Sequence, residues 1–259
     1  MKNVEWAAPY CDIYDKPEYS YRGMMLDVAR HFFSVESVKR QIDYAAKYKI
    51  NKLHMHLADD QGWRLEIKGE MYGESLDKLR TIGASRSCST NGYNPGQYTQ
   101  EEFQELAEYA AERYVEITPE FDMPGHTWAA LVSLNFLNST EDGKPHSGSY
   151  DNTQPYDGWD VGFSSFECRN EKTYEFIEEV IKQVAPLYPS QYIHIGGDEA
   201  HSTSSEDYVY FCNRVTEIAQ KYGKTPIGWQ NYDSIEITNR DNTVTQFWST
   251  GSAQFKSGV

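Results

Sequence analysis

The chain has 259 residues, a formal net charge of −15 at neutral pH and 39% hydrophobic residues. This length suffices for one α/β barrel domain with a sizeable core. The acidic charge and the lack of a basic stripe argue against a nucleic-acid partner. The sequence contains no apolar run of about 20 residues, so we expect no membrane span.

The first third of the chain reads as two strands joined by a helix. Residues 1–21 are polar and aromatic without a period, and we interpret them as a leading segment. Residues 24–28 predict a first strand, and Ser34 is a suitable N-cap for the helix that follows. Residues 52–58 predict a second strand, and the polar residues 69–98 predict a long excursion.

The middle of the chain contains the clearest helix. Thr99 and Glu102 form a capping box, and apolar residues then recur at helical spacing as far as Tyr114. Residues 115–121 predict a third strand. A second polar excursion is expected from about residue 138 to 166, and a helix from Tyr174 to Val184 follows it.

The last third of the chain predicts three more strands. Residues 192–196 predict the fourth, and a helix that Gly223 can terminate comes next. Residues 226–229 and 243–248 predict two short strands, each ending in tryptophan. Strands that alternate with helices of 10–15 residues predict βαβ units.

We therefore expect an α/β fold of the (β/α) TIM-barrel type. The carboxyl ends of its strands would converge on one face. The alternative is a doubly wound sheet, but the glycine-rich phosphate fingerprint is missing after the first strand. The six predicted strands end at polar or aromatic residues: Arg30, Asp59, Asp122, Asp198-Glu199, Trp229 and Trp248.

The stretch YIHIGGDEAH, residues 192–201, is the strongest candidate for a site. Two glycines after an apolar strand allow backbone or ligand to approach closely. Asp198 and Glu199 follow at once, at the strand end where ligands bind in parallel α/β folds.

Several stretches together resemble glycoside hydrolase family 20, the β-N-acetylhexosaminidases. They are RGMMLDVARHFF from Arg22, HLADDQGWR from His56, EFDMPGH from Glu120, HIGGDEAHS from His194, GWQ from Gly228 and TQFW from Thr245. Their order is that of the family, and they cover residues 22 to about 250. The resemblance implies a retaining, substrate-assisted hydrolysis of terminal β-linked N-acetylhexosamine, GlcNAc or GalNAc, through an oxazolinium intermediate.

By this resemblance, Glu199 is the acid and base, and Asp198 orients the acetamido group. Asp59 and His126 resemble the relay that tunes the acid. The alternatives are purely structural roles: a helix N-cap for Asp198 and a hydrogen-bonded turn histidine for His126.

The resemblance also implies four substrate-binding residues. Arg30 would grip the sugar hydroxyls, although an ion pair with Asp27 or Asp59 is the alternative. Trp229 and Trp248 would wall the acetamido pocket, although core packing is the alternative for both. Asp122 would support the loop at His126.

Two other functions stay open at this stage. His54 and His56 lie on one face of a strand, as in metal-dependent amidohydrolase barrels, and a divalent-metal site could be drawn with Asp59, His126, His194 and Asp198. A non-catalytic carbohydrate-binding barrel is the other alternative. The family 20 interpretation implies no cofactor and no metal.

The sequence stops soon after the sixth strand, whereas family barrels have eight. We therefore interpret residues 22–259 as a catalytic barrel whose last strands are missing. The chain would need those strands for full activity, and the open edges of its sheet predict self-association.

Four cysteines without metal spacing predict free thiols: Cys11, Cys88, Cys168 and Cys212. No signal peptide is recognised; the resemblance fits extracellular, cell-surface, lysosomal and cytoplasmic locations alike.

Overall fold

A six-stranded parallel sheet forms the centre of the computed structural model, which describes residues 7–88, 94–138 and 150–249. Its strands are β1 (Gly23–Asp27), β2 (Lys52–Asp59), β6 (Glu116–Phe121), β7 (Tyr192–His194), β8 (Thr225–Trp229) and β9 (Val244–Gln246). Each strand pairs in parallel with the next of these along the chain. A doubly wound sheet would reverse its order part-way. The continuous order therefore confirms a partial TIM-type barrel.

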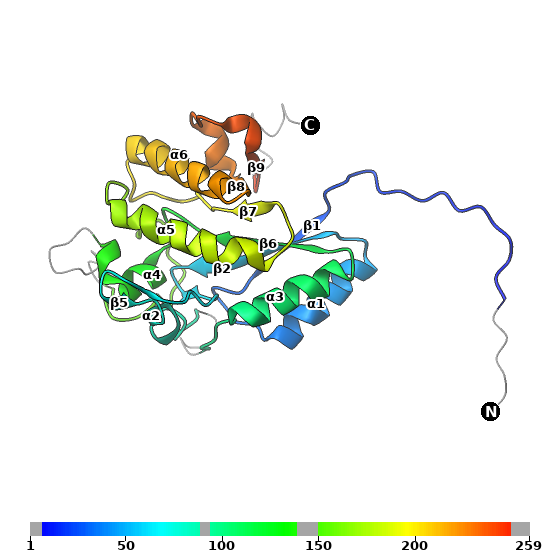
Figure 1. Ribbon diagram of the computed structural model, residues 1–259, viewed down its shortest axis with the longest axis horizontal. Coiled ribbons are helices and arrows are strands. Elements are labelled where there is room, and N and C mark those ends of the chain that lie inside the picture. The colour runs from blue at the N-terminus through cyan, green and yellow to red at the C-terminus, as the bar shows by residue number, and fades with distance from the viewer. Residues whose placement is uncertain (1–6, 89–93, 139–149, 250–259) are drawn as a thin grey trace.

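Four long helices cover one face of this sheet (Figure 1). They are α1 (Val35–Lys47), α3 (Gln100–Ala111), α5 (Glu171–Val184) and α6 (Ser205–Lys221). The predicted caps are confirmed: the Ser34 side chain accepts from Ser37 N–H, and Thr99 and Glu102 form a reciprocal capping box. Gly223 ends the last helix with a φ of +72°, which suits glycine.

The prediction for Tyr114 was wrong. Helix α3 ends at Ala111, and Tyr114 has a φ of 57° and a side chain that is 89% exposed. Its position in the helical series continued the apolar pattern, but the chain had already turned toward β6. The last strand is also shorter than predicted, because β9 ends at Gln246 and Trp248 lies beyond it.

The excursion at residues 69–98 contains regular structure that the sequence did not predict. A short hairpin joins β4 (Glu70–Met71) to β5 (Glu74–Ser75), and the single-turn helix α2 (Lys78–Thr81) follows. β3 (Gly62–Trp63) folds back antiparallel on β2. After β6 come α4 (Trp128–Ser133) and the 3₁₀ turn η1 (Asn135–Leu137), also unpredicted. Parts of both predicted excursions, residues 89–93 and 139–149, lie outside the described residues.

Three more 3₁₀ turns link the later elements: η2 (Ala185–Leu187), η3 (Gln230–Ser234) and η4 (Arg240–Asn242). All four cysteines are free, as predicted. Among the described residues, no helix combines the length and the apolar character needed to cross a membrane.

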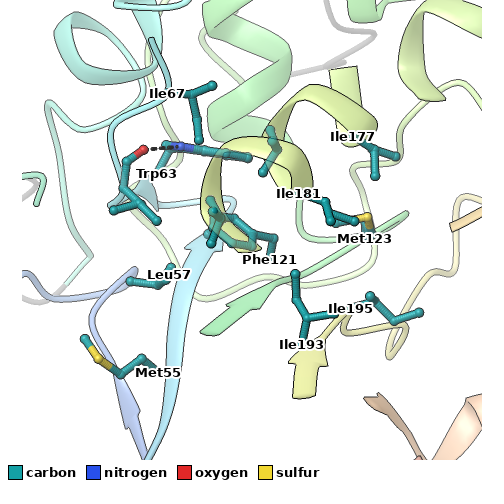
Figure 2. Close-up of a cluster of buried hydrophobic side chains, with 14 of the residues drawn as sticks. Met55, Leu57, Trp63, Ile67, Phe121, Met123, Ile177, Ile181, Ile193 and Ile195 are labelled. Atoms are coloured by element: carbon teal, nitrogen blue, oxygen red, sulfur yellow. Dashed lines mark hydrogen bonds between the residues drawn. The ribbon is translucent and has the colours of Figure 1, made fainter. Parts of the chain in front are cut away.

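Alternation along the strands separates a hydrophobic face from a polar one. Met55 and Leu57 of β2 lie in the hydrophobic cluster beneath the helices, where Ile177 and Ile181 of α5 also lie (Figure 2). His54 and His56 alternate with them, and side chains one residue apart on a strand point to opposite faces. The face away from the helices therefore carries the buried polar groups.

Candidate active site

A buried row of titratable groups crosses the polar face of the sheet. Strand pairing sets Asp27 beside His56, His56 beside Glu120, and Glu120 beside His194. Paired residues on parallel strands project from the same face. The last three are at most 2% exposed. The row thus lies in the barrel interior, close to the carboxyl ends of the strands where TIM-barrel sites form.

The loop after β7 is shaped by two glycines that the site requires. Gly196 has a φ of +68°, and a Cβ there would lie 1.7 Å from Oδ1 of Asp122. Gly197 N–H donates to the same oxygen at 3.0 Å, and the Tyr208 hydroxyl donates to Gly197 O at 2.5 Å. Only glycine fits at position 196. The resulting loop conformation determines where the side chains of Asp198 and Glu199 lie. The N-cap of the following helix is Ser204, so Asp198 does not have the capping role considered above.

Glu199 stands at the outer end of a chain of polar contacts. His126 Nδ1 lies 3.1 Å from Asp59 Oδ1, and His126 Nε2 lies 3.4 Å from Glu199 Oε2. Asp59 and His126 are buried, whereas the Glu199 side chain is 31% exposed. The structure therefore brings the three predicted relay residues together, with only the carboxylate of Glu199 reaching solvent.

The inner part of this chain is strongly charged. Burial opposes ionisation of Asp59, yet His126 and Arg30 hold its pKa below the ordinary value. Burial also opposes a charge on His126, but Asp59 and Asp122 outweigh it and raise the pKa of His126 to about 11. The pair is thus an imidazolium and a carboxylate across the physiological range.

Arg30 is held by two carboxylates. Its guanidinium lies 2.7 Å from Asp59 Oδ2 and 3.0 Å from Asp27 Oδ2. Despite the opposing effect of burial, Asp59 and Asp27 raise the pKa of Arg30. The ion pair that the sequence offered as an alternative is therefore present, while 24% of the side chain stays exposed at the site.

The carboxylates of Asp198 and Asp122 lie close together beside His126. One ligand-type atom from each of these three residues lies within 4.8 Å of the others. Burial and the charge of Asp198 together raise the pKa of Asp122 well above its ordinary value. Asp198 Oδ1 is buried and has no hydrogen-bond partner among the described residues. This oxygen can accept a hydrogen bond from a ligand.

The two predicted tryptophans differ in their surroundings. Trp229 is 8% exposed, and its Nε1–H donates to Glu120 Oε1 at 2.8 Å. Its ring centroid lies 4.6 Å from that of His194. Trp248 is 58% exposed. The structure thus joins Trp229 to the buried row, whereas most of Trp248 faces solvent.

A family model described as "Glycosyl hydrolase family 20, catalytic domain" matches residues 19–208. The chain belongs to glycosyl hydrolase family 20. The residues matched contain Arg30, the Asp59–His126–Glu199 chain and Asp198.

The chain is also similar to proteins named as β-hexosaminidases. The chain is 34% identical to a β-N-acetylhexosaminidase from Cellulomonas fimi over 240 residues, 93% of this chain and 45% of that protein. It is 35% identical to a β-hexosaminidase from Porphyromonas gingivalis over 241 residues, 85% of this chain and 29% of that protein. The solved family 20 β-N-acetylhexosaminidase from Streptomyces coelicolor A3(2) superimposes with a TM-score of 0.80 at 43% identity, covering 93% of this chain and 45% of that one. The chain thus spans less than half the length of each of these relatives.

In the part of the chain that the structure describes, four sets of side chains have ligand-type atoms within 4.8 Å of one another. They are His54, Glu120 and His194; His56, Glu120 and Asp122; Asp59, Asp60 and His126; and Asp122, His126 and Asp198. The imidazoles of His54 and His56, on which the metal alternative rested, both contact Glu120. These nitrogens already have carboxylate partners within the protein. Family 20 membership likewise does not favour the amidohydrolase alternative.

Sequence reasoning gave no role to Glu120, the residue with the most contacts in the buried row. Its carboxylate contacts His54, His56 and His194, and it accepts the indole N–H of Trp229. Glu120 is the second-last residue of β6, and Asp122 directly follows that strand. The signal that could have found it was this position, opposite a strand with two histidines.

Proposed function

We propose that this chain carries the catalytic centre of a retaining β-N-acetylhexosaminidase. It would release terminal, non-reducing β-linked GlcNAc or GalNAc from oligosaccharides or glycoconjugates. The observation that carries the proposal is the position of His126, between the buried Asp59 and the partly exposed Glu199. An acid/base carboxyl needs access to substrate and a neighbouring charge that stabilises its ionised form, and Glu199 has both.

Glu199 acts as acid and then as base. In the first step its proton goes to the glycosidic oxygen, and the bond from that oxygen to C1 breaks. The imidazolium of His126 lies beside the carboxylate that remains and stabilises it. In the second step the same carboxylate takes a proton from the attacking water.

The nucleophile comes from the substrate. The oxygen of the 2-acetamido group attacks C1 as the leaving group departs, which gives the oxazolinium ion. Asp198 accepts a hydrogen bond from the acetamido N–H and stabilises the positive charge there. Its unpartnered, buried Oδ1 suits this role. Water then attacks C1 from the face opposite the acetamido oxygen, the bond from C1 to that oxygen breaks, and the product retains the β configuration.

Arg30, Asp122 and the two tryptophans bind and orient the sugar in this proposal. Arg30 remains partly exposed while Asp27 and Asp59 fix its direction, so it can donate to sugar hydroxyls. Trp229 gives the acetamido pocket a buried indole wall, and Trp248 would add a second wall when substrate is bound. Asp122 supports the loop of Gly196 and Gly197.

Self-association is a further part of the proposal. β1 and β9 form the two edges of the described sheet, and strand edges without a neighbour favour pairing. Sedimentation equilibrium tests this point: a mass that rises with protein concentration supports it, and a monomer at all concentrations refutes it.

Hydrolysis of an aryl N-acetyl-β-glucosaminide tests the proposed activity. We expect release of the aryl group, inhibition by a thiazoline that mimics the oxazolinium ion, and no effect of EDTA. Activity that is lost with EDTA and restored by zinc would favour the amidohydrolase alternative. Thiazoline binding without any hydrolysis would favour the carbohydrate-binding alternative.

A further inference from the structure

The Asp59–His126–Glu199 chain continues inward through two more residues. His56 Nε2 lies 2.7 Å from Asp59 Oδ2, and the other ring nitrogen of His56 contacts Glu120 Oε2. The five side chains alternate between carboxylate and imidazole from the barrel interior to the solvent-facing acid: Glu120, His56, Asp59, His126 and Glu199.

We propose that His56 and Glu120 are positioning residues for the acid/base, because they hold Asp59, and through it His126 and Glu199, in one orientation. The role of Glu199 in this inference rests on the proposed function. The arrangement of the inner residues does not, and it can be tested separately.

His56 can contact both carboxylates as a donor only when both of its ring nitrogens carry protons. The ring is 2% exposed. Burial works against its charge, but Glu120 and Asp27 raise the pKa of His56 well above the ordinary value. Arg30 Nη1 also lies 3.4 Å from His56 Nε2, so Asp59 stands between two cationic groups at this end.

Glu120 is held ionised by its histidines. Burial opposes its charge, yet His56, His194 and His54 lower the pKa of Glu120 well below the ordinary value. Its Oε1 lies 3.1 Å from His194 Nδ1 and also accepts the indole N–H of Trp229. One carboxylate therefore anchors both the inner end of this five-residue chain and the proposed wall of the acetamido pocket.

His54 provides a matched control for His56. The two histidines lie on the same face of β2 and are both buried, and His54 Nε2 lies 2.8 Å from Glu120 Oε2. Among the described residues, His54 has no hydrogen bond to Asp59. A substitution at His54 therefore disturbs the same interior but leaves the contacts from Glu120 through His56 to Asp59 in place.

The test compares the pH profile of kcat/KM for three variants of the full chain on the aryl substrate. His56→Asn removes a positive charge, so the bell-shaped profile should move to higher pH, whereas Glu120→Gln removes a negative charge and should move it to lower pH. Each shift should be about one pH unit, the size expected for a unit charge roughly 10 Å away at an effective dielectric constant of about 20. His54→Asn should leave the profile in place even if it lowers the rate.

Shifts of both variants in the same direction, or an equal shift in His54→Asn, would overturn the inference. Nitrogen-15 NMR of the histidine rings in the unmodified chain gives a readout that needs no activity. We expect both ring nitrogens of His56 to be protonated at pH 8, and a neutral His56 ring at that pH would refute the proposal. If the unmodified chain hydrolyses nothing, the proposed function fails, while the NMR result still decides whether the inner chain exists.

Discussion

His126 Nε2 lies 3.4 Å from Glu199 Oε2, and the backbones of both residues are left-handed, with φ values of 57° and 44°. This conformation is uncommon for residues other than glycine, and strained residues of this kind cluster at active sites. The two residues belong to the loops that follow β6 and β7, which are neighbouring strands. Two adjacent loops thus adopt unfavourable backbone conformations where their side chains meet.

Glu199→Gln should lower kcat by about 100-fold or more, because the amide can neither donate the proton nor accept one from water. Affinity for the thiazoline, measured by calorimetry, should change little because the side chain keeps its shape. Glu206→Gln is the matched control, since the Glu206 side chain is 88% exposed on helix α6. Normal turnover in Glu199→Gln would remove Glu199 as the acid.

His126→Asn should make the free energy of unfolding fall less steeply as the pH rises above neutral. The pKa of His126 is raised from 6.5 to about 11 on folding, chiefly by Asp59 and Asp122 against the effect of burial. Its contribution is therefore fully present below pH 6.5 and is lost as the pH rises toward 11. Urea unfolding at several pH values between 6 and 10 should show a shallower fall in the variant.

The exposed His201 supplies the control for that series. His201→Asn should retain the slope of the unmodified chain. An identical slope in His126→Asn would contradict the ion pair between His126 and Asp59.

Gly196→Ala should disrupt the site, because its Cβ would meet Oδ1 of Asp122 and displace the bond to Gly197 N–H. Gly223→Ala is the matched control, with a similar φ of +72° and no atom within 4 Å of the added Cβ. We expect the control to cost about 1 kcal/mol of unfolding free energy with full activity. Gly196→Ala should cost more and should also abolish turnover; equal effects would show that only backbone strain matters.

Asp60→Asn should stabilise the protein at neutral pH. Burial and the charge of Asp59 raise the pKa of Asp60 to about 6. The folded state thus binds this proton more tightly, and stability is lost as the pH rises from about 4 through 6. Asn keeps an acceptor for Trp128 N–H, which lies 2.9 Å from Asp60 Oδ1. We expect a gain of about 1–2 kcal/mol at pH 8 and none at pH 4, measured by urea unfolding; an equal change at both would contradict the shift.

The strand order and the main helices could be predicted because they depend on local patterns. Ser34, Thr99 and Gly223 carry the helix-end signals in their own side chains or in their lack of one. The conformation of Tyr114 and the short elements at residues 69–98 depend on tertiary packing rather than on the periodicity of hydrophobic residues. The sequence around them contains no signal strong enough to predict that packing.

The candidate site residues that the sequence singles out lie at or after strand ends: Asp59 is the last residue of β2, and Glu199 lies in the loop after β7. Glu120 and His56 were harder to recognise because they lie inside strands, where a polar residue has meaning only through its neighbours on other strands. The pairing of His56 with Glu120 depends on the register of β2 and β6. Register becomes visible only in three dimensions.

The most direct test of the account compares two aryl β-glycosides that differ only at C2. One carries the acetamido group and the other a hydroxyl, and hydrolysis of both by the unmodified chain is followed by release of the aryl group. If the acetamido oxygen is the nucleophile, with Asp198 as its partner and Glu199 as the acid, the N-acetylglucosaminide should be cleaved and the glucoside should not. Comparable rates for the two substrates, or cleavage of the glucoside alone, would contradict the account.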